Sequence, residues 1–257
     1  MPVNSFRSAR AEVAVDIATE AGKIAKHWFE KSHLRVDQKA DGSPVTLADL
    51  EVETYMRETL ATHFPDDTVL GEEFGTTEGT TGYRWILDPI DGTKSFVRSV
   101  PLYANLIALE KDGEVEFGAI NLPSAGVLVH AERGGGCWRN GLPSQVSRHD
   151  RLDGAHVMAT WLEDWLPATI AELTSQGVVL RTWGDAYGYA MVASGHADAI
   201  VDYTARAYDL APMPVIIEEA GGRFTSLGGD RSFERGSGVA SNGVLHESLL
   251  KLVSQAT

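Results

Sequence analysis

The stretch Arg84-Trp-Ile-Leu-Asp-Pro-Ile-Asp-Gly-Thr-Lys-Ser-Phe96 joins an apolar strand to a turn that carries two carboxylates. The apolar run ends at Asp88, and Pro89 cannot continue a hydrogen-bonded strand. Asp91 follows three positions after Asp88. The pattern therefore predicts that both carboxylates emerge together from the end of a strand.

The next residues of this stretch predict an anion site beside the carboxylates. Gly92 and Thr93 open a short helix, whose first backbone N–H groups have no intrahelical partner and can donate to a phosphate. Asp88, Asp91 and the exposed carbonyl oxygen of Ile90 are the hard ligands that magnesium prefers. An isolated Asp-Pro-x-Asp-Gly segment is also typical of a simple turn, so the interpretation depends on the rest of the chain.

Three further acidic positions could join this site. Glu72, in Val69-Leu-Gly-Glu-Glu-Phe74, follows a short strand, although a solvated acidic turn is the plainer interpretation. Asp209 begins an apolar helix, where it could equally cap the N-terminus. Asp49 lies three residues after Thr46, which is the spacing of a capping box. Each position is weak evidence alone, but their order and spacing together favour a metal centre.

Hydrophobic periodicity predicts a mixed α/β (α+β) fold. Apolar residues recur every three or four positions over 5–30 and 46–63, which predicts two long helices. They precede an expected meander-like antiparallel sheet with strands at 68–70, 83–87, 102–109, 114–121 and 126–131. After a polar turn at 142–153, the chain alternates as in an α/β lobe, with strands at 156–159, 178–181 and 199–202 and helices at 167–175, 187–194 and 209–220. We expect one compact domain with a cleft between lobes at 1–144 and 145–257.

The composition fits a globular protein and disfavours several other classes. The chain has 257 residues, 43% of them hydrophobic and 23% charged, which is enough to bury a substantial core. Charged residues interrupt the first thirty positions, and no run approaches the roughly 20 apolar residues of a membrane span. The net charge of −14 repels nucleic acids, and the single Cys137 can form no internal disulfide. We therefore expect a reduced, cytoplasmic protein that binds neither membranes nor nucleic acids.

Several separated motifs, in this order, resemble the inositol monophosphatase superfamily of lithium-sensitive, metal-dependent phosphatases. They are Gly-Glu-Glu at 71–73, Asp-Pro-Ile-Asp-Gly-Thr at 88–93, the aromatic-Asp helix start at 208–209 and Glu-Glu-Ala-Gly-Gly at 218–222. The resemblance runs from Lys39 through Gly222. It implies a layered αβαβα sandwich, a homodimer and inhibition by Li⁺. Many relatives have Trp-Asp where this chain has Tyr208-Asp209, which retains an aromatic side chain.

The resemblance also assigns metal ligands, residue by residue. Glu72, Asp88 and the Ile90 carbonyl would bind one magnesium ion. Asp88, Asp91 and Asp209 would bind a second, with Asp88 bridging the two. A third, weaker magnesium ion would lie near Glu72. The implied reaction is direct in-line hydrolysis, in which one ion activates water and another stabilises the leaving oxygen, without a phosphoenzyme.

Further roles are implied for the residues around these ligands. Thr93 would orient the attacking water and Asp49 would hydrogen-bond Thr93, so that both belong with Glu72 among the catalytic residues. Asp91, Gly92 and Thr93 would contact the phosphate.

Within the superfamily, the chain is most similar to members that hydrolyse histidinol phosphate in histidine synthesis. The similarity lies in Asp-Gly-Thr-Lys-Ser-Phe at 91–96 and in the Gly-Asp and Ala-Ser-Gly motifs of 183–198. Histidinol phosphate carries an ammonium and an imidazole, which favour extra carboxylates around its organic end. Asp185 and Asp202 are the candidates, although Asp185 could be a helix cap and Asp202 a turn residue at a strand end.

Other functions stay open on sequence alone. They include a phosphatase for inositol 1-phosphate or other sugar phosphates and one for 3′-phosphoadenosine 5′-phosphate, which the acidic composition does not support. A catalytically inactive scaffold of the same fold is another alternative, but such a protein could lose at least one of the candidate site residues, and this chain retains Glu72, Asp88, Asp91, Thr93 and Asp209. The eight histidines show no paired spacing of metal ligands, and the sequence gives no basis for assigning Trp161, Glu163 or Asp164.

Overall fold

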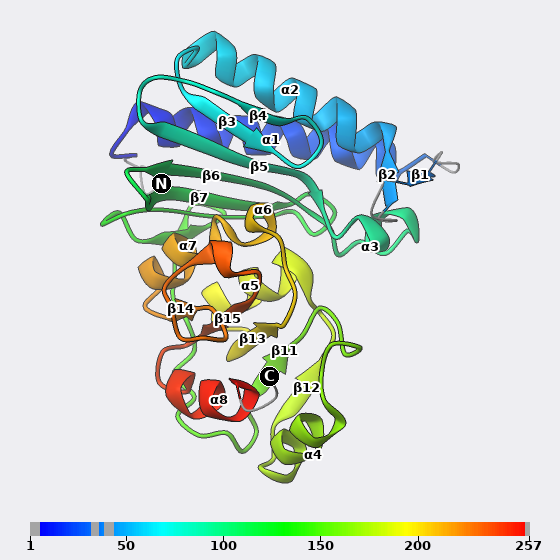
Figure 1. Cartoon of the computed structure of the whole chain (residues 1–257), viewed down its shortest axis with the longest axis vertical. Coiled ribbons are helices and arrows are strands. Elements are labelled where there is room, and N and C mark those ends of the chain that lie inside the picture. Colours follow the sequence, from blue (N-terminus) through cyan, green and yellow to red (C-terminus); the bar gives the residue numbers. More distant parts are fainter. Residues whose placement is uncertain (1–5, 32–35, 39–43, 255–257) are drawn as a thin grey trace.

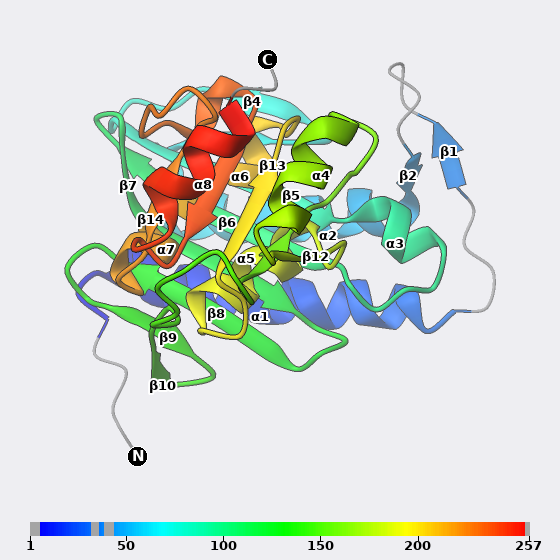
Figure 2. The same ribbon diagram turned by 90° about the horizontal axis from the view of Figure 1, so that it is seen from below.

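Helices and sheets alternate in five layers in the computed structural model of the chain, which describes residues 6–31, 36–38 and 44–254 (Figure 1). The outer face of the first sheet is covered by helices α1 (Ala9–Phe29) and α2 (Leu47–His63). Between the two sheets lie the helices α5 (Asp185–Ala193), α6 (Ala207–Leu210) and α7 (Met213–Glu219). The outer face of the second sheet is covered by α4 (Pro167–Ser175) and α8 (His246–Val253). The predicted αβαβα sandwich is confirmed. Viewed from below, α4 and α8 form the nearest layer (Figure 2).

The first sheet has eight strands in the order β10-β9-β8-β7-β6-β5-β3-β4. They are β3 (Thr68–Gly71), β4 (Gly75–Thr77), β5 (Tyr83–Asp91), β6 (Ala104–Lys111), β7 (Glu114–Leu122), β8 (Val127–Glu132), β9 (Cys137–Arg139) and β10 (Leu142–Ser144). From β5 to β10 the neighbours are antiparallel, as the predicted meander requires. The meander is wrong for β3, which pairs parallel to β5, because the unpredicted β4 reverses the chain once more between them.

The second sheet has five strands in the order β12-β11-β13-β15-β14. They are β11 (His156–Met158), β12 (Val179–Arg181), β13 (Ala199–Asp202), β14 (Arg223–Thr225) and β15 (Gly238–Ser241). The parallel pairing of β11 with β12 and β13 agrees with the predicted strand–helix alternation. The sequence reading missed β14, β15 and α8.

The helix predicted at 209–220 is wrong as a single element, because it divides into α6 and α7 around Pro212. Proline has no backbone N–H and disfavours the helical conformation in the residue before it. A short hairpin of β1 (Val36–Gln38) and β2 (Pro44–Thr46) precedes α2, and a 3-10 turn, η1 (Phe233–Arg235), precedes β15.

Strand β5 does not end at Asp88 as predicted, because it continues through a β-bulge to Asp91. Asp88 is paired with Leu106 and Asp91 with Ala104, so three steps along β5 match two along β6. Residues three apart on a regular strand point to opposite faces, and the extra residue of a bulge restores them to one face. The buried Asn105 side chain donates to the Pro89 carbonyl within this irregular segment. The bulge thus directs both carboxylates into the same space.

The core between the sheets is continuous, since one apolar cluster contains Ile86 and Leu106 of the first sheet and Ile200 and Phe224 of the second. The first sheet ends at Ser144 and the second begins at His156. The division into lobes at 144 stays a prediction. Helix α7 lies very close to β7 at Gly118, where an added Cβ would come within 2.6 Å of the Pro212 carbonyl oxygen.

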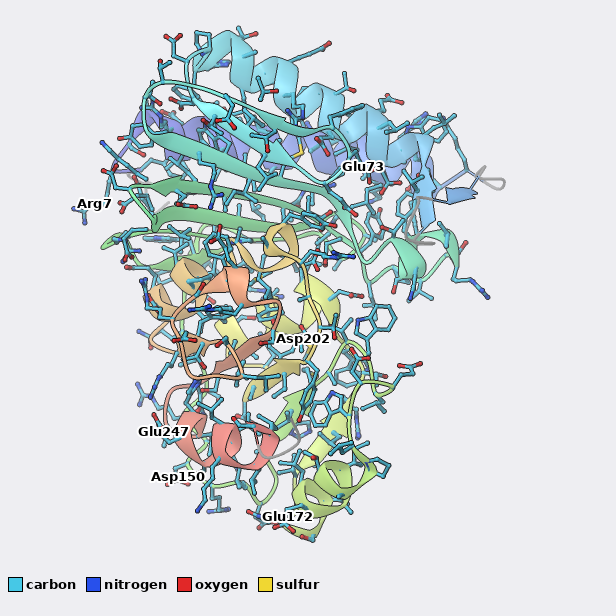
Figure 3. All side chains as sticks on the ribbon, viewed as in Figure 1. Arg7, Glu73, Asp150, Glu172, Asp202 and Glu247 are labelled. Carbon is cyan, nitrogen blue, oxygen red and sulfur yellow. The ribbon has the colours of Figure 1, made fainter. Side chains whose placement is uncertain are left out.

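Most acidic side chains that Figure 3 labels lie at the surface, including Asp150, Glu172 and Glu247 around the second sheet, whereas Asp202 is only 5% exposed. Many acidic side chains of the described residues are therefore solvated surface, as expected, and a smaller set is buried. Among the helices of the described residues, none is both long enough and apolar enough to cross a bilayer.

Candidate active site

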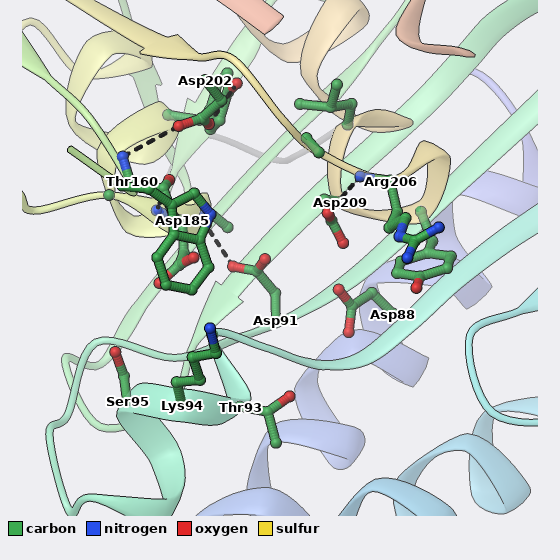
Figure 4. Close-up of a pocket in the computed structure, with 18 of the residues that line it drawn as sticks. Asp88, Asp91, Thr93, Lys94, Ser95, Thr160, Asp185, Asp202, Arg206 and Asp209 are labelled. Atoms are coloured by element: carbon green, nitrogen blue, oxygen red, sulfur yellow. Dashed lines mark hydrogen bonds between the residues drawn. The ribbon is translucent and has the colours of Figure 1, made fainter. Parts of the chain in front are cut away.

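Three carboxylates from distant parts of the chain meet in one cavity (Figure 4). Asp88 and Asp91 come from the bulged end of β5 and Asp209 from α6, and one oxygen of each lies within 4.8 Å of the others. Glu72, in the turn after β3, lines the same cavity of about 350 Å³. The structure thus brings together the four carboxylates predicted from the sequence.

The electrostatics of this cluster fit a bound cation. Asp88 is 1% exposed, and its Oδ1 atom has no hydrogen-bond partner among the described residues. Burial, followed by the charge of Glu72, raises the pKa of Asp88 well above its usual value. Burial also raises the pKa of Asp91 and brings that of Asp209 to about 7. Buried carboxylates that repel one another are stabilised by a divalent cation, for which oxygen ligands of this kind are well suited.

The segment that carries Glu72 is held by a buried ion pair that the sequence interpretation missed. Glu53 of α2 is 0% exposed and accepts hydrogen bonds from the backbone N–H groups of Glu73 (2.7 Å) and Phe74 (3.2 Å). Arg57 donates to Glu53 (2.7 Å) and to the Gly75 carbonyl. The available signal was the acidic residue itself, since Glu53 lies beside Val52 and Met56 on the buried stripe of the helix.

Gly71 has a packing role beside this ion pair. A Cβ atom at position 71 would lie 2.0 Å from Oε1 of Glu53, so that a side chain there would displace the buried carboxylate. The first residue of the Gly-Glu-Glu motif therefore leaves room for Glu53 of α2 to hold the backbone of Glu73 and Phe74.

The segment predicted to bind phosphate forms a short helix directly after the bulged end of β5. Helix α3 (Thr93–Val97) follows Gly92, whose φ of 77° is left-handed and suits glycine. The Thr93 hydroxyl donates to the Ile90 carbonyl at 3.0 Å, which places two of the predicted site residues in direct contact. Ile90, Gly92 and Thr93 all line the cavity.

Asp49 has the local role that its spacing predicts, whereas Asp209 does not cap its helix as an N-cap residue. Asp49 accepts hydrogen bonds from the backbone N–H and the hydroxyl of Thr46, each at 2.7 Å, which confirms the capping box. Its interaction with Thr93 stays a prediction. Asp209 is not the N-cap of its helix, because it is the third residue of α6 and accepts from the Arg206 backbone N–H (2.7 Å).

The opposite wall of the cavity is formed by the start of α5. The Ala186 N–H donates to Asp91 at 2.7 Å, and the Asp185 N–H donates to the Thr160 hydroxyl at 2.7 Å. Asp185 is the first residue of α5 and has a φ of 49°, a left-handed conformation that Asp tolerates better than most residues. Its carboxylate lines the cavity and accepts no hydrogen bond within the described part of the chain. Burial, reinforced by the nearby charge of Asp202, raises the pKa of Asp185 to about 7.

Asp202 is bonded quite differently from Asp185. It ends β13 and accepts from the Thr160 N–H (3.1 Å) and from the Tyr189 hydroxyl (2.9 Å). Burial raises the pKa of Asp202, and these two donors oppose that effect. Asp202 therefore fixes the wall of the cavity, and its predicted contact with substrate stays a prediction.

Lys94 and Trp161 were not assigned from the sequence, yet both line the cavity. The Lys94 ammonium lies 3.9 Å from the centroid of the Trp161 ring. Glu163 and Asp164, by contrast, are exposed and are not among the lining residues. The polar side chains of Ser95, Thr182, Thr204 and Arg206 complete the wall.

Comparison with known proteins bears on what this site does. The model of the inositol monophosphatase family matches residues 7–257. The chain belongs to the inositol monophosphatase family. It is 39% identical to a histidinol-phosphatase from Chlorobaculum parvum, over 94% of this chain and 95% of that one. It is 32% identical to an inositol-1-monophosphatase from Mesorhizobium japonicum, over 97% of each chain.

The fold agrees with the same family. The extragenic suppressor protein SuhB from Bartonella henselae has a TM-score of 0.89 to this structure and is 28% identical, covering 97% of this chain and 100% of its own. The predicted family and enzyme class, a phosphomonoesterase, are confirmed by membership in the inositol monophosphatase family.

The raised pKa of Asp185 predicts a pH-dependent loss of stability in metal-free protein. In the folded state this pKa is about 7, against an ordinary value of 3.8 for an aspartate, so the folded state binds more protons between these two values of pH. The stabilisation is therefore present below about pH 4 and is lost as pH rises through 7. Between pH 5 and 7, the wild type in EDTA should lose roughly 2–3 kcal/mol of unfolding free energy relative to Asp185→Asn, measured by urea denaturation.

Two buried histidines would make the unfolding free energy rise with pH, but their effect is the same in the wild type and in Asp185→Asn and so does not change the difference between them. Burial lowers the pKa of His130 and of His246 to about 4, and both residues are present in the wild type and the variant. Parallel pH profiles for the two proteins would contradict the assignment.

Proposed function

We propose that this chain is a magnesium-dependent phosphatase that hydrolyses L-histidinol phosphate to L-histidinol and phosphate. The observation that carries the proposal is the Asp185 carboxylate, which accepts no hydrogen bond from the described residues and lies one residue from the N–H that binds Asp91. A substrate with an ammonium near its phosphate ester would place that cation beside Asp185. The 39% identity to a histidinol-phosphatase supports the same substrate.

Glu72, Asp88, Asp91, Asp209 and the Ile90 carbonyl would hold two or three magnesium ions. Bound there, magnesium would neutralise phosphate charge, lower the pKa of a water molecule and stabilise the leaving oxygen. The fit rests on the crowded buried carboxylates and on the partnerless Oδ1 atom of Asp88. We expect EDTA and Li⁺ to suppress activity.

The chain itself would supply orientation and exclusion of water. Asp91 is fixed by the Ala186 N–H, so the two walls of the cavity keep their separation. The Thr93 hydroxyl, held at the Ile90 carbonyl, would position the water that attacks phosphorus, and Gly92 would allow the phosphate to approach the backbone. Asp185 would bind the ammonium and so orient the leaving alcohol.

A second candidate substrate is inositol 1-phosphate or another sugar phosphate. The hydroxyl groups of Thr160, Thr182 and Thr204 line the cavity and could bind a polyol. A neutral polyol would offer the Asp185 carboxylate no charge-assisted hydrogen bond, so it would gain less binding free energy at this wall than an ammonium group would. We therefore place histidinol phosphate first.

Steady-state kinetics on histidinol phosphate, inositol 1-phosphate and glycerol 1-phosphate, at one magnesium concentration, test the proposal. Asp185→Asn should lower kcat/KM for histidinol phosphate by about 10- to 100-fold, the range of a charge-assisted hydrogen bond of about 1.5–3 kcal/mol. Its effect on glycerol 1-phosphate should be within about threefold.

Asp202→Asn is the matched control for this test, because it removes a buried carboxylate that already has two protein donors. If Asp202 acts only through its two protein donors, both activities should fall in parallel, whereas a selective loss on histidinol phosphate would support its predicted contact with substrate. An equal loss on both substrates in Asp185→Asn would remove the reason for choosing histidinol phosphate.

We place the enzyme in histidine synthesis, as a homodimer in the reducing cytoplasm. The buried thiol of Cys137 supports a reduced state, since burial raises its pKa to about 12 and so suppresses the reactive thiolate.

A further inference from the structure

A cationic side chain of the protein itself, Lys94, lines the cavity on the side that carries Asp185. The Lys94 ammonium is 3.9 Å from the centroid of the Trp161 ring, which is the distance of a cation–π contact. The charge of Lys94 also acts on Asp185, where it lowers the pKa against the larger effect of burial. Figure 4 shows the Lys94 side chain directed from α3 toward the wall that carries Asp185. The same ammonium thus contacts an aromatic ring and lies in the electrostatic field of a carboxylate on the same cavity wall.

The three residues come from separate elements that converge only in the folded chain. Lys94 belongs to α3, Trp161 to the segment between β11 and α4, and Asp185 to the first turn of α5. All three line the cavity. An aromatic face combined with a carboxylate is the chemistry by which proteins recognise ammonium groups, because ring quadrupole and anion both attract a cation.

We propose that Trp161 and Asp185 form an ammonium subsite, which Lys94 fills in the free protein and which the ammonium of the substrate takes over on binding. This inference rests on the proposed function and extends it to the residues that select the substrate. The exchange replaces one cation with another, so the charge of the wall does not change. Lys94 follows Thr93 in α3, so its released ammonium stays beside the predicted phosphate site.

Selectivity follows from this exchange. An alcohol that carries an ammonium group can displace Lys94, because its own cation then interacts with the Trp161 ring and the Asp185 carboxylate in place of Lys94. A neutral polyol restores neither and must either leave Lys94 in place or expose the Asp185 charge. Trp161 therefore discriminates by charge, although it is not charged itself.

Calorimetric titration with L-histidinol, ethanolamine and glycerol tests the subsite, at fixed ionic strength and saturating magnesium. Trp161→Leu should weaken binding of both ammonium ligands by about tenfold and leave glycerol unchanged. Lys94→Gln should tighten binding of L-histidinol several-fold, because no internal cation competes. Trp161→Phe, which keeps an aromatic face, should remain within about threefold of the wild type.

Trp183→Leu is the matched control, because Trp183 is 42% exposed and is not among the lining residues. It should bind all three ligands as the wild type does. Wild-type affinity for L-histidinol in Trp161→Leu, or weaker binding in Lys94→Gln, would overturn the subsite. The proposed function fails separately, if the wild type does not hydrolyse histidinol phosphate, and in that case ethanolamine binding would still depend on Trp161.

Discussion

Asp88→Asn is expected to reduce kcat by about a thousandfold or more, equivalent to roughly 4 kcal/mol of transition-state stabilisation. Asp88 lies at the centre of the acidic cluster, where its pKa responds to Glu72, Asp91 and Asp209 together. An amide keeps the shape of the side chain but removes the charge and one acceptor oxygen, so neither shared ion would be held as before. Steady-state kinetics over a magnesium titration measure the loss.

The fold should survive this substitution, and the metal-free variant should be more stable than the wild type. At a pH high enough to ionise the buried carboxylates, removing one charge relieves their repulsion, which thermal unfolding in EDTA would register as a higher Tm. Asp112→Asn makes the same chemical change at an exposed turn with a φ of 52°, which Asn tolerates, and should leave both activity and Tm unchanged. Full activity in Asp88→Asn would refute the metal assignment.

The β-bulge explains why the site was easier to predict than the strand that carries it. The types and order of Asp88, Asp91 and Asp209 indicate their chemistry, and proline between the first two indicates irregular backbone. A period of two would nevertheless send Asp88 and Asp91 to opposite faces. Their common direction depends on pairing with β6, which lies on a separate segment of chain.

Long-range pairing also accounts for the other differences from prediction. The parallel arrangement of β3 and β5 depends on β4, a three-residue strand with exposed side chains and no apolar pattern. Lys94 and Trp161 meet only because α3 and the segment after β11 face each other across the cavity. Local patterns identified the long helices because their apolar faces are encoded within single segments.

Glu53→Ala is expected to have the second largest effect, on stability and metal binding together. The substitution leaves the Glu73 and Phe74 N–H groups without their acceptor and Arg57 without its buried partner. Loss of one member of such a pair costs about 3–5 kcal/mol, and we expect about 3 because Arg57 is partly exposed. Urea denaturation would measure this loss.

The hydrogen bonds from the Glu73 and Phe74 N–H groups to Glu53 would also determine how well Glu72 is positioned to bind a cation. Glu72 must approach Asp88 and Asp209 despite their mutual repulsion, so its backbone has to be restrained from the other side. Glu53 provides that restraint, and without it the affinity for magnesium should fall at least tenfold, as is common for groups that orient metal ligands. Calorimetric titration with magnesium measures this affinity without reference to turnover.

Glu58→Ala separates this effect from the general consequences of removing a glutamate from α2. Glu58 is exposed on the same helix, so the change should leave both unfolding free energy and magnesium affinity within about 0.5 kcal/mol of the wild type. Glu53→Gln should fall between the two, because it keeps one acceptor oxygen but turns an NH₂ group toward backbone donors. If Glu53→Ala lost stability but bound magnesium as tightly as the wild type, the ion pair would support the fold alone, and Glu72 would have to be positioned by the hydrogen bond from its backbone N–H to the Leu87 carbonyl.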